Sequence, residues 1–322
     1  MAQPFDAVLL VAFGGPQGPA DVRPFLQNVL RGRRVPPSRV EEVAHHYDRF
    51  GGVSPLTELT LAQARGLDAA LRERGAPLPV YVGMRNWHPY LRDTLEQMAH
   101  AGVRRAIGVL AAAQRSYSGC LQYRENVRDA LTELRAAGTP AVDVTYVGDW
   151  HTHPGFIEAN AAHARDALLR LPANLQTRAR IVFTAHSIPV TMAQQYPYER
   201  QLRESAALVA AALGREDWML VFQSRSGRPE DPWLEPDVCE YLRTTADLDA
   251  VVLSPVGFLC DHIEVLYDLD VEAAAVCRER GLPMARADAV NAHPAFISAV
   301  RDAVIDVWER YRGGRPLKLV NW

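Results

Sequence analysis

The sequence predicts an α/β fold with mainly parallel sheets, built as two similar halves. Short apolar runs alternate with longer segments of helical periodicity along the whole chain of 322 residues. This alternation is typical of parallel sheets whose two faces are covered by helices, and the runs are apolar almost throughout, which favours buried strands. At about 150 residues per domain, the length suggests two domains with a core each.

Seven apolar runs are predicted to be strands. They occupy residues 7–13, 79–84, 105–112, 142–147, 180–186, 218–224 and 249–258. Runs 7–13 and 180–186 each lead directly into a turn that contains proline. This correspondence suggests a weak internal repeat whose halves join near residues 148–158. We therefore expect one domain over residues 1–150 and a second over residues 151–322.

Helices are predicted between these strands. Segment 57–75 repeats leucine and alanine at helical spacing and ends in glycine. Segment 89–102 opens with proline and closes with glycine, the favoured polarity of helix ends. Similar patterns predict helices over residues 155–171, 199–213, 261–280 and 294–312.

Composition excludes several classes of protein. Lys and Arg number 35 against 38 Asp and Glu, and the resulting net charge of −3 argues against a dedicated nucleic-acid-binding protein. No apolar run reaches the ~18 residues of a membrane span. The opening residues MAQPFD lack the basic region of a signal peptide, so we expect a cytoplasmic protein. Four cysteines without a Cys-x-x-Cys pair are expected to be buried free thiols.

A first candidate site lies in the stretch TAHSIP, residues 184–189. His186 ends an apolar strand immediately before a turn, and ligands bind at this edge of open α/β sheets because the loops there leave a crevice. An imidazole in this place can bind a metal or accept a proton. On position alone, a histidine that merely completes the strand end is an equally good interpretation.

A second candidate site is a row of acids at Glu264, Asp268 and Glu272. Four residues of an α-helix turn through about 400°, so the three carboxylates follow one face with ~40° of drift per step. Three carboxylates on one face repel one another, and a bound cation would relieve this repulsion. A solvated acidic surface also explains the pattern. With His186, one of these acids would form a donor pair suited to Fe²⁺, Co²⁺ or Zn²⁺, too small for a permanent closed site. The buried face of the same helix is expected to comprise Val265, Leu266, Leu269, Ala273, Val276 and Cys277.

A third set of residues lies in the N-terminal half. Gly14 and Gly15 follow a strand, but neither a Gly-x-Gly-x-x-Gly nor a Gly-Lys-Ser/Thr pattern accompanies them, so a nucleotide loop is weakly supported. The alternative is a cleft wall for a flat macrocycle, with rings against its face and cations or hydroxyls for its carboxylates. Each aromatic residue is by itself more often part of a core. The candidates are Phe13, Tyr47, Phe50, Trp87, Tyr117, Tyr123, Arg31, Ser54 and Arg85.

Together these stretches resemble the ferrochelatase family. The resemblance rests on LLVAFGGP, HHYDRFGGVSPLTELT, YVGMRNWHPYLRDTLEQMAHAGVRRA, FTAHSIP, FQSRSGRPEDPWLEPDV and SPVGFLCDHIEVLYDLD, which follow the family's order from residue 9 to residue 270. AHSIP and VGFxxDHIEVLYDLD are the most specific of them. LRGRR near residue 30, taken with QSRSGRPEDPWLEPDV, is most similar to the bacterial branch that metallates coproporphyrin III.

The resemblance implies two similar Rossmann-like domains of the chelatase type with a porphyrin cleft between them. It also implies insertion of Fe²⁺, as a substrate, into a porphyrin with release of two protons, late in haem biosynthesis. By motif, His186 and Glu264 match the pair that handles metal and protons, and Asp268 and Glu272 match an acidic row leading outward. Porphyrin contacts are implied for Ser54, Tyr123, Arg31, His46, Tyr47 and Phe13.

Two departures from the family are visible. Position 13 is phenylalanine, where some members carry a tyrosine that ligates the product iron, and a phenyl ring has no oxygen to donate. Some relatives hold a [2Fe–2S] cluster through a cysteine in the context of Cys120 and others near the C-terminus. Because the final stretch RYRGGRPLKLVNW has no cysteine and no hydrophobic anchor, we expect no cluster, no membrane span and no permanently bound cofactor. A monomer is expected.

Several other functions stay open. The substrate could be protoporphyrin IX in place of coproporphyrin III, or the protein could be a non-catalytic tetrapyrrole carrier. A cobalt or sirohydrochlorin chelatase is a third alternative. The retained pair of His186 and Glu264 argues against a carrier, and the family motifs spread along the chain argue against a sirohydrochlorin enzyme.

Overall fold

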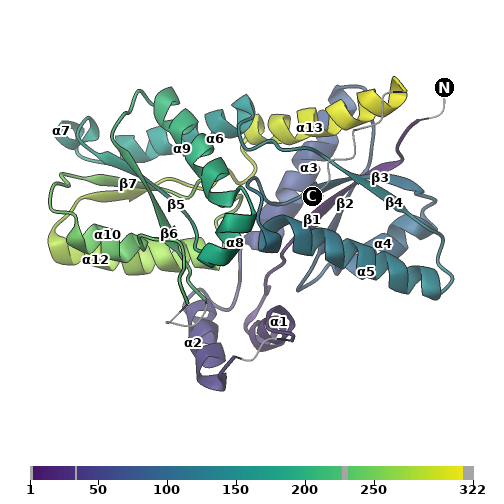
Figure 1. Ribbon diagram of the computed structural model, residues 1–322, viewed down its shortest axis with the longest axis horizontal. Coiled ribbons are helices and arrows are strands. Elements are labelled where there is room, and N and C mark those ends of the chain that lie inside the picture. The colour runs from purple at the N-terminus through teal and green to yellow at the C-terminus, as the bar shows by residue number, and fades with distance from the viewer. Residues whose placement is uncertain (1–2, 33–34, 227–230, 315–322) are drawn as a thin grey trace.

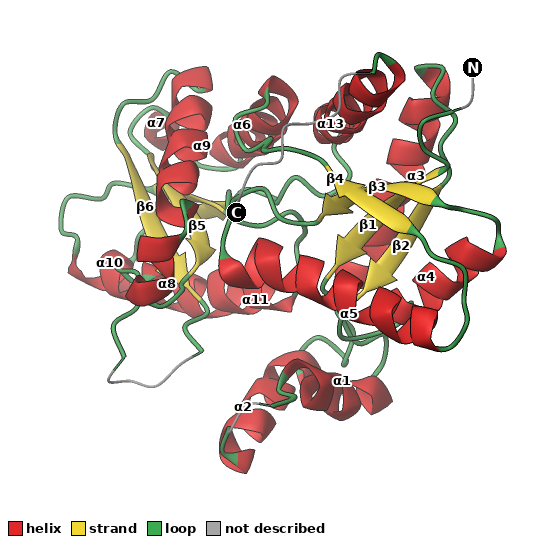
Figure 2. Ribbon diagram, turned by 45° about the vertical axis from the view of Figure 1, so that its right-hand side comes forward, coloured by secondary structure: helices red, strands yellow, loops and turns green. Residues whose placement is uncertain are grey.

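The computed structural model describes residues 3–32, 35–226 and 231–314, and these form two four-stranded parallel sheets (Figure 1, Figure 2). The first sheet has the order β2-β1-β3-β4, from β1 (Ala7–Ala12), β2 (Val80–Met84), β3 (Arg105–Leu110) and β4 (Asp143–Tyr146). The second has the order β6-β5-β7-β8, from β5 (Arg180–His186), β6 (Trp218–Gln223), β7 (Val251–Ser254) and β8 (Met284–Arg286). Counted from its own first strand, each sheet has the order 2-1-3-4. The predicted pair of similar α/β halves is therefore confirmed.

All seven predicted strands are present, with differences at their ends. The strand predicted over residues 249–258 is reduced to β7, because Pro255 has no N–H with which to continue the ladder. The sequence did not predict β8, which pairs with β7 over only three residues. Such a short strand leaves too few residues for a recognisable apolar run.

The helices and turns of the described chain fall into predicted and unpredicted groups. Five helices lie within two residues of their predicted ends: α3 (Leu56–Glu73), α4 (Leu91–His100), α6 (Pro154–Leu169), α9 (Tyr198–Ala212) and α13 (Pro294–Arg312). Six others were not predicted: α1 (Val22–Val29), α2 (Pro37–Asp48), α5 (Gln122–Ala136), α7 (Ala173–Gln176), α8 (Val190–Gln195) and α10 (Val238–Thr244). The 3₁₀ turn η1 (Pro19–Asp21) and the π-helical turn η2 (Tyr117–Leu121) precede α1 and α5.

The segment predicted as one helix over residues 261–280 has three parts. These are α11 (Ile263–Val265), the π-helix η3 (Leu266–Ala273) and α12 (Ala274–Arg280). The expectation of a regular α-helix is therefore wrong for the middle part. Of the six residues expected on its buried face, five are buried and Leu266 is partly exposed.

Helices cover both faces of each sheet, and one core is shared by the two halves. Along β1, alternate side chains point to opposite faces, so Ala7, Leu9 and Val11 pack with α4 and α5. The intervening residues of β1 join a core that also contains residues of α3, α6, α9, α13 and β5. The remaining face of the second sheet packs on α10, η3 and α12.

Buried amide groups join the two halves across the shared core. Gln63 of α3 donates from Nε2 to the backbone oxygens of Leu259 (3.0 Å) and Asn291 (2.9 Å), more than 190 residues along the chain. Helix α13 packs against both α6 and α3, so the end of the chain returns to the first half. The division between residues 150 and 151 stays a prediction.

Two further sequence predictions concern the whole chain. Within the described residues, no helix has the length and apolarity that crossing a membrane requires. All four cysteines are free, and Cys260 and Cys277 are buried as expected. The expectation of full burial is wrong for Cys120 and Cys239, which are partly exposed because each packs at the edge of a core cluster.

Candidate active site

His186 is the last residue of β5, next to the point where the order of the second sheet reverses between β5 and β7. Its Nδ1 lies 2.6 Å from the backbone oxygen of Ser187. Because a carbonyl oxygen only accepts, Nδ1 carries the hydrogen of the neutral ring, and the lone pair is left on Nε2. The backbone oxygen of His186 accepts from the hydroxyl of Tyr198 at 3.0 Å. The first bond orients the imidazole, and the second holds the backbone of the same residue.

Glu264 reaches the same edge of the sheet from the loop that follows β7. The residue is the second of α11 (Ile263–Val265), and its backbone N–H donates to Nδ1 of His262, the residue before the helix, at 3.3 Å. Its Oε2 lies 3.7 Å from Nε2 of His186, and the two side chains are 46% and 32% exposed. This distance is too long for a hydrogen bond. It matches the roughly 3–4 Å between two ligands that each bind one divalent ion at about 2.0–2.2 Å.

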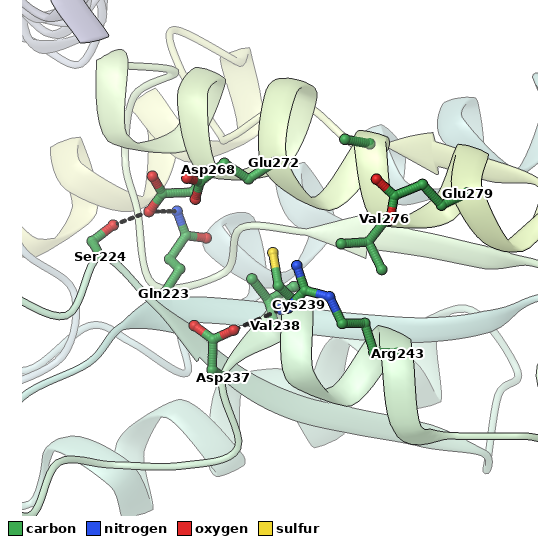
Figure 3. A pocket seen from close by; sticks show the side chains of 11 residues that line it. Gln223, Ser224, Asp237, Val238, Cys239, Arg243, Asp268, Glu272, Val276 and Glu279 are labelled. Atoms are coloured by element: carbon green, nitrogen blue, oxygen red, sulfur yellow. Dashed lines mark hydrogen bonds between the residues drawn. The ribbon is translucent and has the colours of Figure 1, made fainter. Parts of the chain in front are cut away.

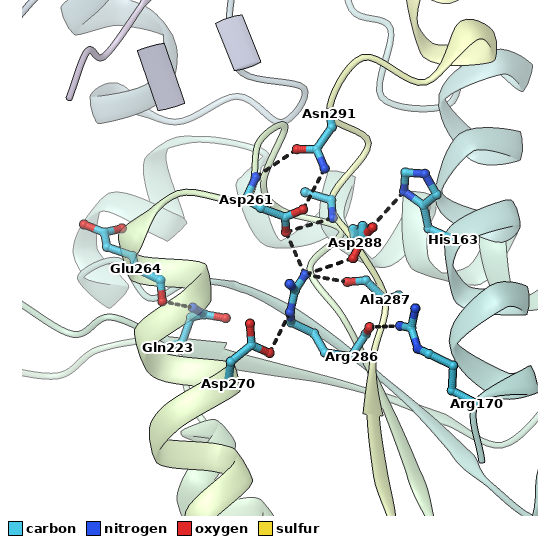
Figure 4. Close-up of polar contacts among 11 residues, drawn as sticks. His163, Arg170, Gln223, Asp261, Glu264, Asp270, Arg286, Ala287, Asp288 and Asn291 are labelled. Atoms are coloured by element: carbon cyan, nitrogen blue, oxygen red, sulfur yellow. Dashed lines mark hydrogen bonds and ion pairs between the residues drawn. The ribbon is translucent and has the colours of Figure 1, made fainter. Parts of the chain in front are cut away.

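A network of hydrogen bonds fixes the loop before Glu264 (Figure 4). Asp261 accepts from Arg286 Nη1 at 2.7 Å and from Asn291 Nδ2 at 2.6 Å. Arg286 also donates from Nε to Asp270 of η3 at 2.8 Å. The network therefore ties both the loop and the π-helix to β8 and the segment after it. Sequence reasoning did not find these residues, because their partners come from distant parts of the chain.

The acidic row continues from Glu264 along η3 to Asp268 and Glu272. A π-helix closes its hydrogen bonds over five residues in place of four, so each turn takes up more residues than in an α-helix. Four residues then come closer to one full turn, and Asp268 and Glu272 form a straighter row than the predicted drift implies. The predicted drift is wrong for this physical reason. π-helical turns of this kind are frequent at functional sites.

Asp268 is held by two side chains from the end of β6 (Figure 3). Ser224 donates its hydroxyl to Oδ2 of Asp268, and Gln223 donates from Nε2 to the same oxygen at 3.3 Å and to the backbone oxygen of Glu264 at 3.1 Å. Ser224 has a φ of +61°, a conformation that a residue other than glycine seldom adopts. Gln223 pairs with His186 in the parallel register, which is why these residues lie at the site.

The environment of Asp268 favours the protonated form of its carboxyl group. Burial raises the pKa of Asp268 to about 7, and the charges of Glu264 and Glu272 add to the rise while the Ser224 hydroxyl opposes it. Burial also raises the pKa of Glu272. Both acids line a cavity of about 390 Å³ between α10 and α12 (Figure 3), so the row has an open space beside it.

The variant Asp268→Asn is expected to be more stable than the parent at pH 8. Between the ordinary pKa of 3.8 and the folded value of about 7, the folded protein keeps a proton that the unfolded chain releases. The free energy of unfolding therefore carries no penalty from this group below pH 4, and it falls as the pH rises toward 7, where the folded protein must ionise a buried carboxyl. Asparagine cannot ionise, so the gain at pH 8 should be about 1–3 kcal/mol and should vanish near pH 4. Urea unfolding at both pH values checks this, and a difference independent of pH would contradict it.

Two tyrosines of the first half lie within the field of Glu264. Burial raises the pKa of Tyr47 in α2, and the charge of Glu264 adds to the rise. Burial also raises the pKa of Tyr123 in α5 to about 12, with Glu264 contributing and the Arg85 guanidinium, 4.9 Å above the ring, opposing. The structure thus brings both tyrosines, which the sequence predicted as porphyrin contacts, to the side of the site that faces the first half.

The other predicted porphyrin contacts have more varied surroundings. Phe13 follows β1, with the guanidinium of Arg85 5.8 Å from its ring, and the ring of His46 stacks on that of Tyr267. Ser54 is buried, and its hydroxyl accepts from the backbone N–H of Leu56 at 3.4 Å. Arg31 is exposed beyond the end of α1 and donates to Asn28 at 2.8 Å. In the described part of the chain, no hydrogen bond, ion pair or ring contact links Arg31 or Ser54 to the His186–Glu264 pair.

The donor groups suit brief binding of a cation. In the described ranges, no cluster of three or more His, Cys, Asp or Glu side chains has the arrangement of a metal site. His186 and Glu264 offer one nitrogen and one carboxylate. An ion held by two protein ligands keeps most of its coordination positions open for another molecule. Such a pair can pass an ion or a proton on, because it does not enclose it.

The amino-acid sequence is similar to a known protein family and to individual relatives. A family model described as Ferrochelatase matches residues 5–307. The chain is 50% identical over 304 residues to a ferrochelatase of Rhodopirellula baltica, a match that covers 92% of this chain and 84% of that protein. It is 46% identical over 322 residues to a coproporphyrin III ferrochelatase of Streptomyces coelicolor, with 95% and 86% covered.

Solved structures of low sequence identity share the fold. The sirohydrochlorin chelatase SirB from Bacillus subtilis subspecies spizizenii, in complex with cobalt, is 12% identical with a TM-score of 0.59, and the match covers 95% of this chain and 97% of that chain. CbiX, a terminal enzyme of siroheme biosynthesis, is 12% identical with a TM-score of 0.51, covering 93% and 98%. This likeness confirms the predicted chelatase-type fold of two α/β domains.

Proposed function

The chain belongs to the ferrochelatase family, and from that premise we propose that it inserts Fe²⁺ into coproporphyrin III. As a member of this family it is a metal-chelating lyase of haem biosynthesis, with iron as a substrate. The observation that carries the proposal is the 3.7 Å between Nε2 of His186 and Oε2 of Glu264, with Nδ1 of the same ring already bonded to a backbone oxygen. These two side chains are the proposed handling pair for metal and protons.

The chemistry of insertion requires what this pair can supply. A porphyrin must lose two N–H protons, and its nitrogen lone pairs lie in the plane of the ring until the ring is distorted. Binding energy spent on distorting the macrocycle between the two halves would expose these lone pairs. The free lone pair of His186 would then accept a proton, since a neutral imidazole nitrogen is the side-chain group that most often acts as a general base.

Glu264 and the acids beyond it would carry charge to and from this point. A carboxylate beside Nε2 neutralises part of the charge of Fe²⁺ or of a protonated imidazole. Asp268, with its pKa of about 7, can take up and release a proton at the pH of the cell. We propose that Asp268 and Glu272 guide iron inward or protons outward, with the cavity between α10 and α12 as the solvent side of that path.

Coproporphyrin III is proposed as the preferred porphyrin over protoporphyrin IX. The support is the S. coelicolor relative named for that substrate and the exposed Arg31, a cation available to the additional propionates of coproporphyrin. One extra charged hydrogen bond is worth about 1.5–3 kcal/mol, so kcat/KM should favour coproporphyrin III by roughly tenfold or more. Parallel turnover of both porphyrins with Fe²⁺ tests this. Equal or better use of protoporphyrin IX would overturn the preference, and absence of insertion into either would favour a tetrapyrrole carrier.

We further propose a cytoplasmic monomer without a [2Fe–2S] cluster or other permanent cofactor. Such a cluster normally needs four thiolates. The chain has four cysteines in all, and Cys260 and Cys277 are enclosed in the core at 3% and 2% exposure. Iron analysis of the purified protein tests the absence of a cluster, and its mass in solution tests the monomer.

A further inference from the structure

Arg286, the last residue of β8, binds two carboxylates that lie before and after Glu264 in the chain (Figure 4). Its Nη1 donates to Oδ1 of Asp261 at 2.7 Å, and its Nε donates to Oδ1 of Asp270 at 2.8 Å. Glu264 lies in the stretch between these two acids. One guanidinium therefore holds both ends of the stretch that carries the carboxylate of the proposed handling pair.

The register of the second sheet brings this guanidinium to the site. Arg286 pairs with Leu253 of β7 in the parallel ladder, so it lies at the edge where β7 leads into the loop before Glu264. The side chains of Arg286 and Asp261 are each 13% exposed. An ion pair that is this well buried is screened by salt much less than a surface pair. The short strand β8 thus places a protected cation beside the loop.

Asp261 is also held by Asn291, which follows β8. Nδ2 of Asn291 donates to Oδ2 of Asp261 at 2.6 Å, and Oδ1 of Asn291 accepts from the backbone N–H of Asp261 at 3.0 Å. The backbone oxygen of Asn291 accepts in turn from Nε2 of Gln63 in α3 at 2.9 Å. Because α3 belongs to the first half, the loop before Glu264 is fixed relative to both halves of the molecule.

The carboxylate of Glu264 has little support of its own. Its side chain is 46% exposed, and among the described residues His186 is the one basic side chain within ion-pair distance of it. Neutral hydrogen bonds hold its main chain, one from Gln223 at 3.1 Å and one to His262 at 3.3 Å. Hydrogen bonds between charged groups are roughly twice as strong as neutral ones. The place of this carboxylate therefore depends mainly on the charged bonds of Arg286 at the two ends of the stretch.

We propose that Arg286 is a positioning residue that sets the distance between Glu264 and His186. In the described part of the chain no hydrogen bond or ion pair joins it to either of these side chains, and it acts through Asp261 and Asp270. The part of the proposal that concerns metal insertion rests on the proposed function. A misplacement of about 1 Å at a reacting group can lower a rate by about 10²-fold, so a residue in this role affects turnover from a distance.

Crystal structures of two variants test the position of Glu264 directly. Arg286→Lys keeps the positive charge, but an ammonium group lacks the rigid fork with which a guanidinium bonds two acids. Asp270→Asn weakens the bond at one end only, and Asp270 is 38% exposed, so the fold should persist. In Arg286→Lys the distance from Nε2 of His186 to Oε2 of Glu264 should differ from that of the parent by more than about 0.5 Å, and Asp270→Asn should change it in the same direction.

Asp288→Asn is the matched control for both variants. The carboxylate of Asp288 lies 3.6 Å from the same Nη1 of Arg286 and is half exposed, but it belongs to the segment after β8 and not to the stretch that carries Glu264. This variant should keep the parent's distance between the two side chains. It separates the loss of any acid near Arg286 from the loss of an acid that holds the site.

Co²⁺ binding without porphyrin, followed by calorimetry, gives a second readout. Groups that hold metal ligands in place typically contribute 10–100-fold to metal affinity. Arg286→Lys should weaken the Co²⁺ binding that His186→Ala abolishes by roughly tenfold or more, and Asp270→Asn should weaken it by roughly three- to tenfold. In iron insertion, kcat should fall by a similar factor, while KM for coproporphyrin III should stay within about twofold of the parent.

The outcomes that would overturn the positioning role are distinct from failure of the proposed function. An unchanged distance in both Arg286→Lys and Asp270→Asn, or an equal change in Asp288→Asn, would overturn the role. A lower melting temperature with the parent's Co²⁺ affinity and kcat would also overturn it, because Arg286 would then only stabilise the fold. If the parent binds no Co²⁺ at this pair, the distances alone decide. If distances and affinities change as expected but no protein metallates a porphyrin, the positioning role stands and the proposed function fails.

Discussion

Replacing His186 with alanine is expected to lower kcat for iron insertion by roughly 10²–10⁴-fold. The change removes the Nε2 lone pair beside Glu264, and with it both the metal contact and the proton acceptor. The side chain is partly exposed and ends a strand, so the fold should persist and the melting temperature should change little. The decay of metal-free porphyrin absorbance after addition of Fe²⁺ measures the effect.

His163 of α6 provides a matched control for this variant. Its Nδ1 also lies near a backbone oxygen, that of Asp288 at 3.1 Å, but it is not a member of the site. His163→Ala should therefore retain the turnover of the parent. Near-normal turnover of His186→Ala would remove that residue from the mechanism, whatever the control does.

Replacing Glu264 with glutamine is expected to lower kcat by roughly 10²–10³-fold. Glutamine keeps the shape of the side chain but loses its charge, so the pair can no longer balance a divalent ion or a protonated imidazole. Since both groups act on the same ion and protons, His186→Ala combined with Glu264→Gln should be little slower than the slower single variant. Glu309→Gln, which removes a carboxylate from α13, is the control. Fully multiplicative losses in the double variant would show that the two residues act independently.

The main site residues could be predicted because they occupy strand and helix ends. His186 closes one apolar run, and Glu264 lies in the first turn of the helix that follows another. In a parallel sheet these ends share one edge. The partners of Asp268 could not be found in this way. Gln223 and Ser224 reach it only through the register that sets Gln223 beside His186, and a single sequence does not reveal that pairing.

Other differences have equally specific causes. The π-helical turns of η3 were missed because eight residues are too few to separate its period from that of an α-helix. Helix α5 did carry a readable signal, since Tyr123, Val127, Ala130 and Leu134 recur at helical spacing and are buried. The start of the same segment, with Tyr117 and Tyr123, also fits a binding wall, and the two patterns overlap there. The stack of His46 on Tyr267 joins residues more than 200 positions apart.

The central claim is that His186 and Glu264 hold one ion between them. Crystals soaked with Co²⁺, a stand-in for Fe²⁺ with similar ligand preferences, test it by anomalous diffraction. The account predicts a single strong peak within about 2.0–2.3 Å of both Nε2 of His186 and the carboxylate of Glu264. The same peak should be lost in crystals of His186→Ala. Cobalt bound elsewhere at saturation, with no density between these two side chains, would contradict the account.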